Sequence, residues 1–309
     1  MADPQRAGLT AESGALQRFL LEPQPLRGHW VRLGPAWLEL RARHSYPPVV
    51  EALLGEAATA AVLLTATLKF AGTLTLQFAG SGRVRLLVAQ CTDDFQLRAV
   101  AHHDLQADET ADFSALVGAG RLAVTVQPDA SVAQYQGIVP LEGNNLGACL
   151  EHYFESSEQL PTRLKLAADA TRAGGMLVQK LPGKAAVDEG GAALLQTTWQ
   201  DLQAGLEALS PTDLLELKVE DAVRRVAGTH DCRLFGATPV RFSCRCNATR
   251  VADLVRSLGI DEARAALAEQ GALTVTCEFC GRAYRYDAVD VEQLFAAAGS
   301  LQQSPQSYN

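Results

Sequence analysis

From His29 to about Pro182 the hydrophobic pattern alternates between strand-like and helix-like stretches, and the strand-like ones predict a series of strands. The stretch 30–40 is also expected to be extended. Gly80 and Gly82 on either side of Ser81 suit a hairpin turn between the first two strands of the series. The predicted strands cover residues 73–80, 82–90, 95–101, 121–127, 132–141, 162–170 and 174–182.

Two stretches in the same region have the apolar content of packed helices. The first, residues 47–68, begins with two prolines, and its most apolar part is too short and too rich in threonine for a membrane span. The second, residues 144–158, repeats Leu146, Leu150 and Phe154 at four-residue steps. Strands interrupted by two helices predict an α+β domain with a mostly antiparallel sheet and packed helices.

A connector follows, after a break at residues 183–190. Five apolar residues recur at steps of four and three and lie on one helix face: Leu195, Trp199, Leu202, Leu206 and Leu209. Ser210 and Asp213 resemble a capping box for the next helix. This face either packs permanently on the N-terminal domain or packs conditionally and can be released. Periodicity alone favours permanent packing, because most amphipathic helices are core elements.

The last part of the chain reads as a small separate unit. Extended stretches over 240–246 and 273–287 alternate with helices over 248–259, 261–271 and 289–299. The predicted organisation is therefore an N-terminal α+β domain over 1–183, a helical linker over 184–231, a small C-terminal unit over 232–298 and a disordered tail over 299–309.

Charge limits the classes of partner. The 309 residues carry a formal net charge of -8, and the segment from Cys232 onward holds eight arginines, no lysine and eight acidic residues. This balance argues against a nucleic-acid or anionic-lipid surface. A nucleic-acid-binding zinc module stays as the alternative that a salt-dependent shift with RNA or DNA would support. The N-terminus shows no basic stretch leading into an apolar run, so we expect a cytoplasmic protein.

The cysteines carry the clearest chemistry. Cys244 and Cys246 form a C-x-C pair, and Cys277 and Cys280 form a C-x-x-C pair thirty intervening residues later. Two close pairs separated by a helical insertion supply the four thiolates of a tetrahedral zinc site, and we expect one Zn²⁺ per chain. A site saturated by four cysteines leaves no position for water, which argues against metal-assisted hydrolysis.

The same thiolates could also respond to oxidants. A disulfide within C-x-C closes a tight ring of the readily reduced kind, and oxidation of the thiolates would eject the metal. A small unit that folds around zinc would then unfold, together with whatever leans on it. Most all-cysteine zinc sites are only structural, so spacing alone leaves both interpretations open. Five arginines flank the pairs and could offset their charge: Arg241, Arg245, Arg250, Arg282 and Arg285.

The remaining candidates favour ordinary roles. Cys91, Cys149 and Cys232 sit apart from any other cysteine and are expected to be core residues, with no redox role supported. An enzyme in the N-terminal domain is the other alternative, with a site imagined from Tyr135, His152, Glu155 and Glu158. No nucleophile, phosphate-loop or zinc-protease motif supports it, so we expect no enzymatic activity and assign these residues to contacts within the fold.

Several long motifs resemble one family, the redox-regulated thirty-three-kilodalton heat-shock holdases of bacteria. They are FSCRCNATR, the spacing to CEFC, YRYD and VDVEQLF, together with YQGIVPLEG, YFESSEQLPT and GGMLVQKLPG. The resemblance covers the chain from about Trp30 to Phe295. Asn247 stands where the family usually has serine, and it is not a ligand position.

The resemblance implies a stress-response chaperone that holds unfolding proteins without ATP. It implies that Cys244, Cys246, Cys277 and Cys280 bind zinc in the reduced, inactive form. On oxidation Cys244 would pair with Cys246 and Cys277 with Cys280, zinc would leave, and the linker would unfold to expose a client-binding surface. The active form would dimerise, and its partners would be unfolded or partly folded proteins, with no nucleic acid and no membrane.

Overall fold

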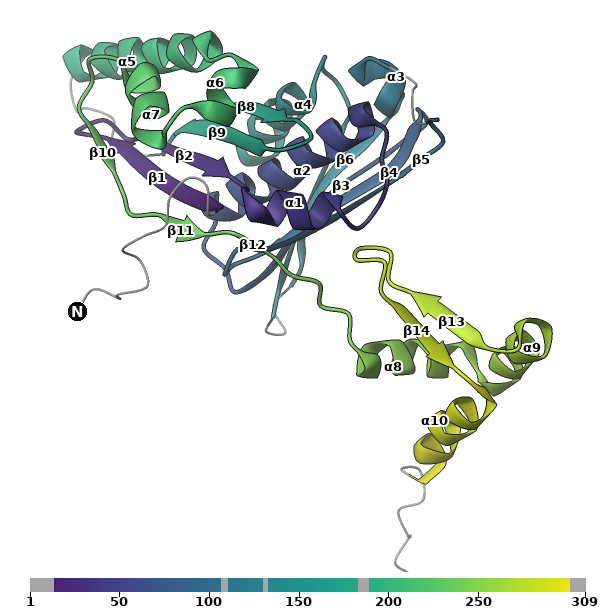
Figure 1. Ribbon diagram of the computed structural model, residues 1–309. Helices are drawn as coiled ribbons and strands as arrows, with labels where there is room; N and C mark the ends of the chain where they lie inside the picture. Colours follow the sequence, from purple (N-terminus) through teal and green to yellow (C-terminus); the bar gives the residue numbers. More distant parts are fainter. Residues whose placement is uncertain (1–13, 107–110, 130–132, 183–188, 301–309) are drawn as a thin grey trace, which may run out of the picture. The chain divides into compact units, whose positions relative to one another are not determined.

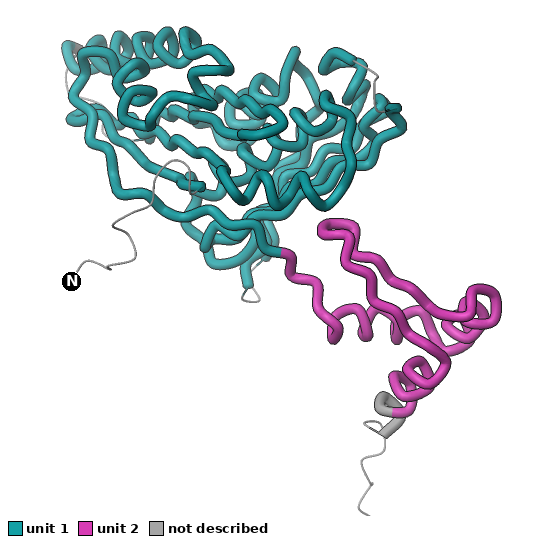
Figure 2. The backbone as a smooth tube through the Cα atoms, viewed as in Figure 1, with its two compact units in different colours: residues 1–243 teal, residues 244–309 magenta. Residues whose placement is uncertain are grey.

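The computed structural model describes residues 14–106, 111–129, 133–182 and 189–300, and the chain divides into two compact units at Ser243 and Cys244 (Figures 1 and 2). The predictions for the N-terminal leader, the start of the linker and the tail beyond residue 300 lie outside the described residues. The α+β class is confirmed: each unit combines helices with mostly antiparallel strands.

The first unit contains two six-stranded sheets where one was expected. The first sheet has the order β10-β1-β2-β9-β8, and β11 also pairs with β1, all antiparallel. Its strands are β1 (Ala15–Leu21), β2 (Leu26–Arg32), β8 (Thr162–Ala168), β9 (Ala173–Lys180), β10 (Cys232–Leu234) and β11 (Thr238–Pro239).

The second sheet has the order β12-β5-β4-β3-β6-β7. Among the described strands it is antiparallel throughout except where β12 runs parallel to β5. Its strands are β3 (Gly72–Gly80), β4 (Val84–Thr92), β5 (Gln96–His103), β6 (Gly120–Pro128), β7 (Tyr135–Pro140) and β12 (Arg241–Phe242).

Helix α2 (Pro48–Thr67) packs against strands of both sheets and forms the centre of the larger core. It is long and apolar enough to cross a membrane by composition, but 72% of its apolar window is buried inside the protein. That burial is typical of a core helix and agrees with the sequence-based expectation. Its two buried threonines return their hydroxyl hydrogen bonds to the helix, Thr59 to Gly55 and Thr65 to Ala61.

The extended interpretation of residues 30–40 is wrong in its second half. Gly34 adopts a positive φ of 50°, and Pro35 then begins helix α1 (Pro35–Arg41). Proline at the first helical position is favoured because the helix leaves that N–H unpaired anyway. Helix α3 (Phe113–Val117) is short. The second predicted helix is α4 (Leu146–Tyr153), which continues as a π-helical turn, η3 (Phe154–Glu158).

The linker helices α5 (Glu189–Ala208), α6 (Pro211–Glu216) and α7 (Val219–Ala227) cover the face of the first sheet that points away from α2 (Figure 1). The predicted capping box is confirmed: the Ser210 hydroxyl accepts from the Asp213 N–H, and the Ser210 N–H donates to the Asp213 carboxylate. The first unit is therefore layered as linker helices, first sheet, α2 and second sheet.

Residues 232–243 run along the edges of both sheets and join the linker to the second unit. The sequence places the start of the C-terminal unit at Cys232, whereas the compact unit begins at Cys244. The difference arises because Phe235 N–H donates to Arg18, Arg241 N–H to Phe95 and Ser243 N–H to Leu97, all through backbone carbonyls. We call residues 232–243 the strap.

The second unit has three helices and a two-stranded sheet: α8 (Ala248–Leu258), α9 (Ile260–Gln270), β13 (Leu273–Thr276), β14 (Ala283–Tyr286) and α10 (Ala288–Ser300). Its described core is small and contains only alanine and valine: Val251, Ala252, Val255, Ala263, Ala272 and Val291. So little buried apolar surface gives weak stability to a unit of this size.

A buried carboxyl on α2 gives a pH prediction. Burial raises the pKa of Glu56 from 4.5 to about 7. The folded chain therefore binds this proton more tightly than the unfolded chain, and stability is lost as pH rises from about 4.5 to about 7. We expect Glu56→Gln to raise the free energy of unfolding by about 2 kcal/mol near pH 8 and by less than about 1 kcal/mol near pH 5. Thermal unfolding followed by circular dichroism measures this.

The matched control is Glu39→Gln, because Glu39 is an exposed carboxylate on α1. We expect it to change stability little at either pH. A gain for Glu56→Gln that is the same at both pH values would contradict the assignment of the effect to ionisation.

Candidate functional site

The four paired cysteines converge in the second unit. Cys244 and Cys246 lie between β12 and α8, while Cys277 and Cys280 lie in the turn that joins β13 to β14. Asn247 follows the first pair and caps the N-terminus of α8, since its side chain accepts a hydrogen bond from the Arg250 N–H. Gly281 closes the second pair with a φ of 69° and donates its N–H to the Cys277 carbonyl.

The spacing of the sulfur atoms fits a tetrahedral metal ion. The Cys244 and Cys277 sulfurs are 3.6 Å apart, the Cys246 and Cys280 sulfurs are 3.4 Å apart, and all four lie within 4.8 Å of one another. A zinc ion with Zn–S bonds of about 2.3 Å needs sulfurs about 3.8 Å apart. The cysteines are free thiols. The donor set and its geometry therefore match a Zn²⁺ site of the all-thiolate kind.

The pKa values of these thiols indicate that four thiolates need a positive charge nearby. Burial acts to raise the pKa of Cys246, but hydrogen bonds from Tyr284 and the neighbouring thiols outweigh it and lower that pKa to about 7. Burial and the contact with Cys246 raise the pKa of Cys280 to about 12. One thiolate thus forms readily, whereas burial first and the neighbouring sulfurs second oppose a negative charge on Cys280. A bound dication removes this obstacle.

Two neighbours of the cluster complete its electrostatics. The Tyr284 hydroxyl donates to the Cys246 sulfur at 3.3 Å, a contact that the sequence did not single out although its YRYD motif follows the second pair. The pKa of Arg282 is raised by its hydrogen bond with Tyr284 and then by attraction to Cys246 and Cys280. Of the five flanking arginines, Arg282 is therefore one that faces the sulfurs.

The three other cysteines lie in environments that keep their thiols protonated. Burial raises the pKa of Cys91 to about 12 and that of Cys149 to about 11, and it also raises the pKa of the half-buried Cys232. Thiols held protonated react slowly with oxidants. These environments agree with the expectation that all three are packing residues.

The imagined enzyme site does not assemble as a catalytic group. Tyr135 and Glu158 do meet, at 3.0 Å, and the Tyr153 hydroxyl also donates to the same Glu158 oxygen at 2.7 Å. This arrangement joins edge strand β7 to the end of η3. Among the described residues, no side-chain hydrogen bond or ion pair brings His152 or Glu155 into it, and the cluster connects two elements of the fold.

The five-residue face of the linker is buried as one surface. Leu195, Trp199, Leu202, Leu206 and Leu209 pack with apolar residues of α6 and α7 onto the first sheet. The sheet contributes Phe19, Leu21, Leu26, Trp30, Ala167, Met176 and Val178. We call this side of the sheet the covered face. It forms a second core, separate from the one around α2.

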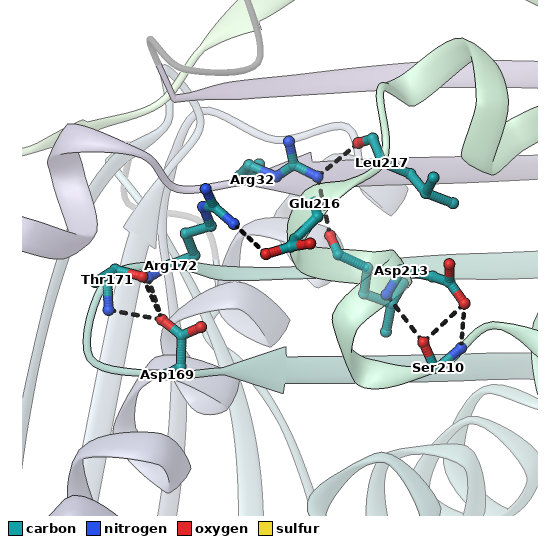
Figure 3. Close-up of polar contacts among 9 residues, drawn as sticks. Arg32, Asp169, Thr171, Arg172, Ser210, Asp213, Glu216 and Leu217 are labelled. Carbon is teal, nitrogen blue, oxygen red and sulfur yellow. Dashed lines mark hydrogen bonds and ion pairs between the residues drawn. The ribbon is translucent and has the colours of Figure 1, made fainter.

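Polar contacts at the covered face come from three cations: Arg32 on β2, Lys165 on β8 and Arg172 in the turn between β8 and β9. Arg32 donates to the carbonyls of Leu214 and Leu217 at the end of α6, at 3.2 and 2.7 Å (Figure 3). Arg172 pairs with Glu216 at 2.9 Å (Figure 3).

Lys165 is the third of these cations, and it donates to the Glu207 carbonyl near the end of α5 at 2.6 Å. Each of the three cations thus contacts an oxygen near the C-terminal end of a linker helix, where the helix dipole is negative. Sequence patterns did not reveal these residues, because their partners are distant in the chain.

The fold and the cysteine cluster can be compared with those of known proteins. A family model described as Hsp33 protein matches residues 14–287. This chain belongs to the Hsp33 family. The resemblance seen in the sequence is thereby confirmed, and with it the assignment of the chain to a family of chaperones.

Hsp33 relatives match over nearly their full length. A protein named 33 kDa chaperonin from Pseudomonas paraeruginosa is 42% identical over 292 residues, which cover 94% of this chain and 97% of that one. Another of the same name from Nitrosococcus oceani is 40% identical and covers 91% and 93%. The crystal structure of the Hsp33 homologue from Thermotoga maritima has the same fold, with a TM-score of 0.78 at 23% identity over 93% of this chain and 99% of that one.

Removing one thiol tests whether the four act together as a metal site. Binding energies of about 10–16 kcal/mol shared among four ligands give about 3 kcal/mol for each. We therefore expect Cys280→Ser to weaken Zn²⁺ binding by about a hundredfold. Competition with a chromophoric chelator measures the affinity. Cys232→Ser is the control, and equal zinc affinity in both variants would contradict the site.

Proposed function

We propose that this protein is a redox-regulated, ATP-independent holdase that prevents aggregation of unfolding or oxidatively damaged proteins. In its reduced form the four cysteines hold one Zn²⁺ and the linker covers the first sheet. Oxidation forms two disulfides, Cys244 with Cys246 and Cys277 with Cys280, and releases the metal. The observation that carries the proposal is a thiol cluster in a poorly cored unit, joined through the strap to helices that cover an apolar sheet face.

The size of its core supports a metal-dependent second unit. Six alanine and valine residues form its described interior, and a bound Zn²⁺ would add about 10–16 kcal/mol of folding free energy. Zn²⁺ supplies the charge that stabilises all four thiolates. Tyr284 and Arg282 would then orient and balance the sulfurs. Loss of the metal leaves too little apolar burial to keep the unit folded.

Incomplete polar pairing supports a linker that is only marginally docked. Among the described residues, the indole N–H of Trp30 and the Nε of Arg32 are buried under the linker without a hydrogen-bond partner. Each such group costs about 1–3 kcal/mol relative to water. A cavity of about 330 Å³, lined in part by Lys165, Gln203 and Glu207, also opens between β8 and α5. Release of the linker would let water reach these donors.

The strap supports a physical route from unfolding at the cysteines to release of the linker. Its last backbone hydrogen bond, from Ser243 N–H to the Leu97 carbonyl, lies one residue before Cys244. Its first strand, β10, begins five residues after α7 ends, and Cys232 packs against the linker core. Unfolding that starts at the cysteines would therefore fray the strap before it reaches α7. The linker would leave last.

The remaining parts of the proposal concern setting and partners. We propose that the protein works in the cytoplasm, binds partly folded clients and dimerises when oxidised, without acting on nucleic acid or membranes. The names of its relatives as chaperonins support client binding. Linker release would leave apolar residues such as Trp30 and Met176 exposed on each chain, which favours association.

The decisive experiment follows three quantities during one peroxide titration. We expect reduced protein to carry about one zinc per chain and to leave an unfolding client unprotected. Peroxide with mild heat, or hypochlorous acid, should release the zinc, consume four thiols and switch on protection in parallel. Chelator absorbance, thiol titration and light scattering report the three changes. Equal protection by reduced and oxidised protein would refute the switch.

Two leucines on α5 provide a matched test of the linker. Leu202 is fully buried against the sheet, whereas Leu194 is 52% exposed. Shortening a buried leucine costs about 2–5 kcal/mol. We expect Leu202→Ala to lower the peroxide concentration and temperature needed for activity, and Leu194→Ala to leave both unchanged. An unchanged threshold in Leu202→Ala would contradict release of the linker as the activating step.

A further inference from the structure

The covered face carries charge of one sign. Alternation along β2, β8 and β9 points Arg32, Arg163, Lys165 and Lys180 toward the linker, and β1 contributes no charged side chain to this face. Glu151 of α4 lies 3.7 Å from Arg163 and offsets that one cation. The face is therefore apolar at its centre and cationic around it.

Two of the three linker helices that cover this face, α5 and α6, have the opposite character, whereas α7 carries two acidic and two basic residues. Residues 189–216, which form α5 and α6, contain five acidic side chains and neither lysine nor arginine. The sheet cations use this complementarity through the Glu216 carboxylate and the backbone carbonyls at the helix ends (Figure 3). The apolar anchors and the negative groups of the linker thus form one combined pattern.

Two donors on the covered face remain unused while the linker is in place. The Trp30 indole N–H is fully buried, and Arg32 is 8% exposed; in the part of the chain that the structure describes, neither the indole N–H nor the Arg32 Nε has an acceptor. Donors in such positions favour an occupant that brings more oxygen acceptors than the linker does.

We infer that the covered face, once released, selects client segments in which apolar residues are interspersed with glutamate or aspartate and lack lysine and arginine. This inference rests on the proposed function and adds a charge preference to it. Arg32, Arg172, Lys165 and Lys180 would bind the client carboxylates and carbonyls, while Trp30 and Met176 would contact its apolar side chains.

Overall charge and local charge make opposite predictions, which makes the inference testable. The whole chain has a net charge of -8, so long-range attraction favours basic peptides. The covered face favours acidic ones. A preference for acidic segments by the oxidised protein can therefore not come from the overall field.

The experiment uses oxidised full-length protein and two fluorescent peptides. Both are apolar and helix-forming, one with glutamates between its leucines and the other with lysines at the same positions. We expect anisotropy titrations to give about three- to tenfold tighter binding of the glutamate peptide, as a few partly exposed charge pairs would supply. Arg172→Glu combined with Lys165→Glu should remove or reverse this preference.

Arg121→Glu is the matched control, because Arg121 is an exposed arginine on β6 of the second sheet. It reverses one charge outside the covered face, half the charge change of the double variant, and should leave the preference intact. Reduced wild-type protein should bind neither peptide, since the linker occupies the face.

Each other outcome has a defined meaning. Equal binding of both peptides, or tighter binding of the lysine peptide, overturns the inference while aggregation protection keeps the proposed function. Aggregation protection without binding of either peptide overturns the inference as well. If, in that case, the oxidised dimer dissociates in the variant with Arg172→Glu and Lys165→Glu, a second copy of the chain occupies the face. Loss of both binding and protection in the oxidised wild type refutes the proposed function itself.

Discussion

The packing of three linker helices onto one side of a twisted sheet is the interaction on which the rest of the arrangement depends. It buries Trp30, Met176 and Val178 of the sheet beneath leucines of α5 and α6. Without the linker, the first unit would expose the apolar side chains of this sheet face. The same contact thus keeps these apolar side chains away from water.

The polar margin of this interaction is incompletely paired. Its apolar centre is well buried, yet its polar margin leaves the Trp30 indole N–H and the Arg32 Nε without acceptors among the described residues. Buried guanidinium groups lose hydration that a few carbonyl contacts replace only in part. These two groups therefore reduce the stability that the contact between linker and sheet gains from apolar burial.

The second unit depends less on apolar packing than the first. The described core of the second unit contains only alanine and valine, so apolar burial alone gives the unit around the four cysteines little stability. The strap holds the chain between these two parts in place, because its backbone hydrogen bonds run from just after α7 to the residue before Cys244. The four cysteines and the linker helices are thereby joined through a segment of paired main chain.

The sequence by itself determined the cysteine set, the linker face and the mixed class of the fold. These are local signals: Cys277 and Cys280 are close in the chain, and Leu195 to Leu209 repeat with the period of a helix. The capping box at Ser210 is equally local, and it formed as predicted. By contrast, helix α1 was missed because Gly34 and Pro35 reverse an extended pattern within one residue.

Only the tertiary structure decided which surfaces meet. It assigned residues 232–243 to the first unit, since their partners on β1 and β5 lie far away in the chain. It also placed Arg32 and Arg172 at the end of α6 and Tyr284 beside Cys246. Contacts of this kind depend on strand register and helix docking, and no periodicity in a single sequence encodes either of them.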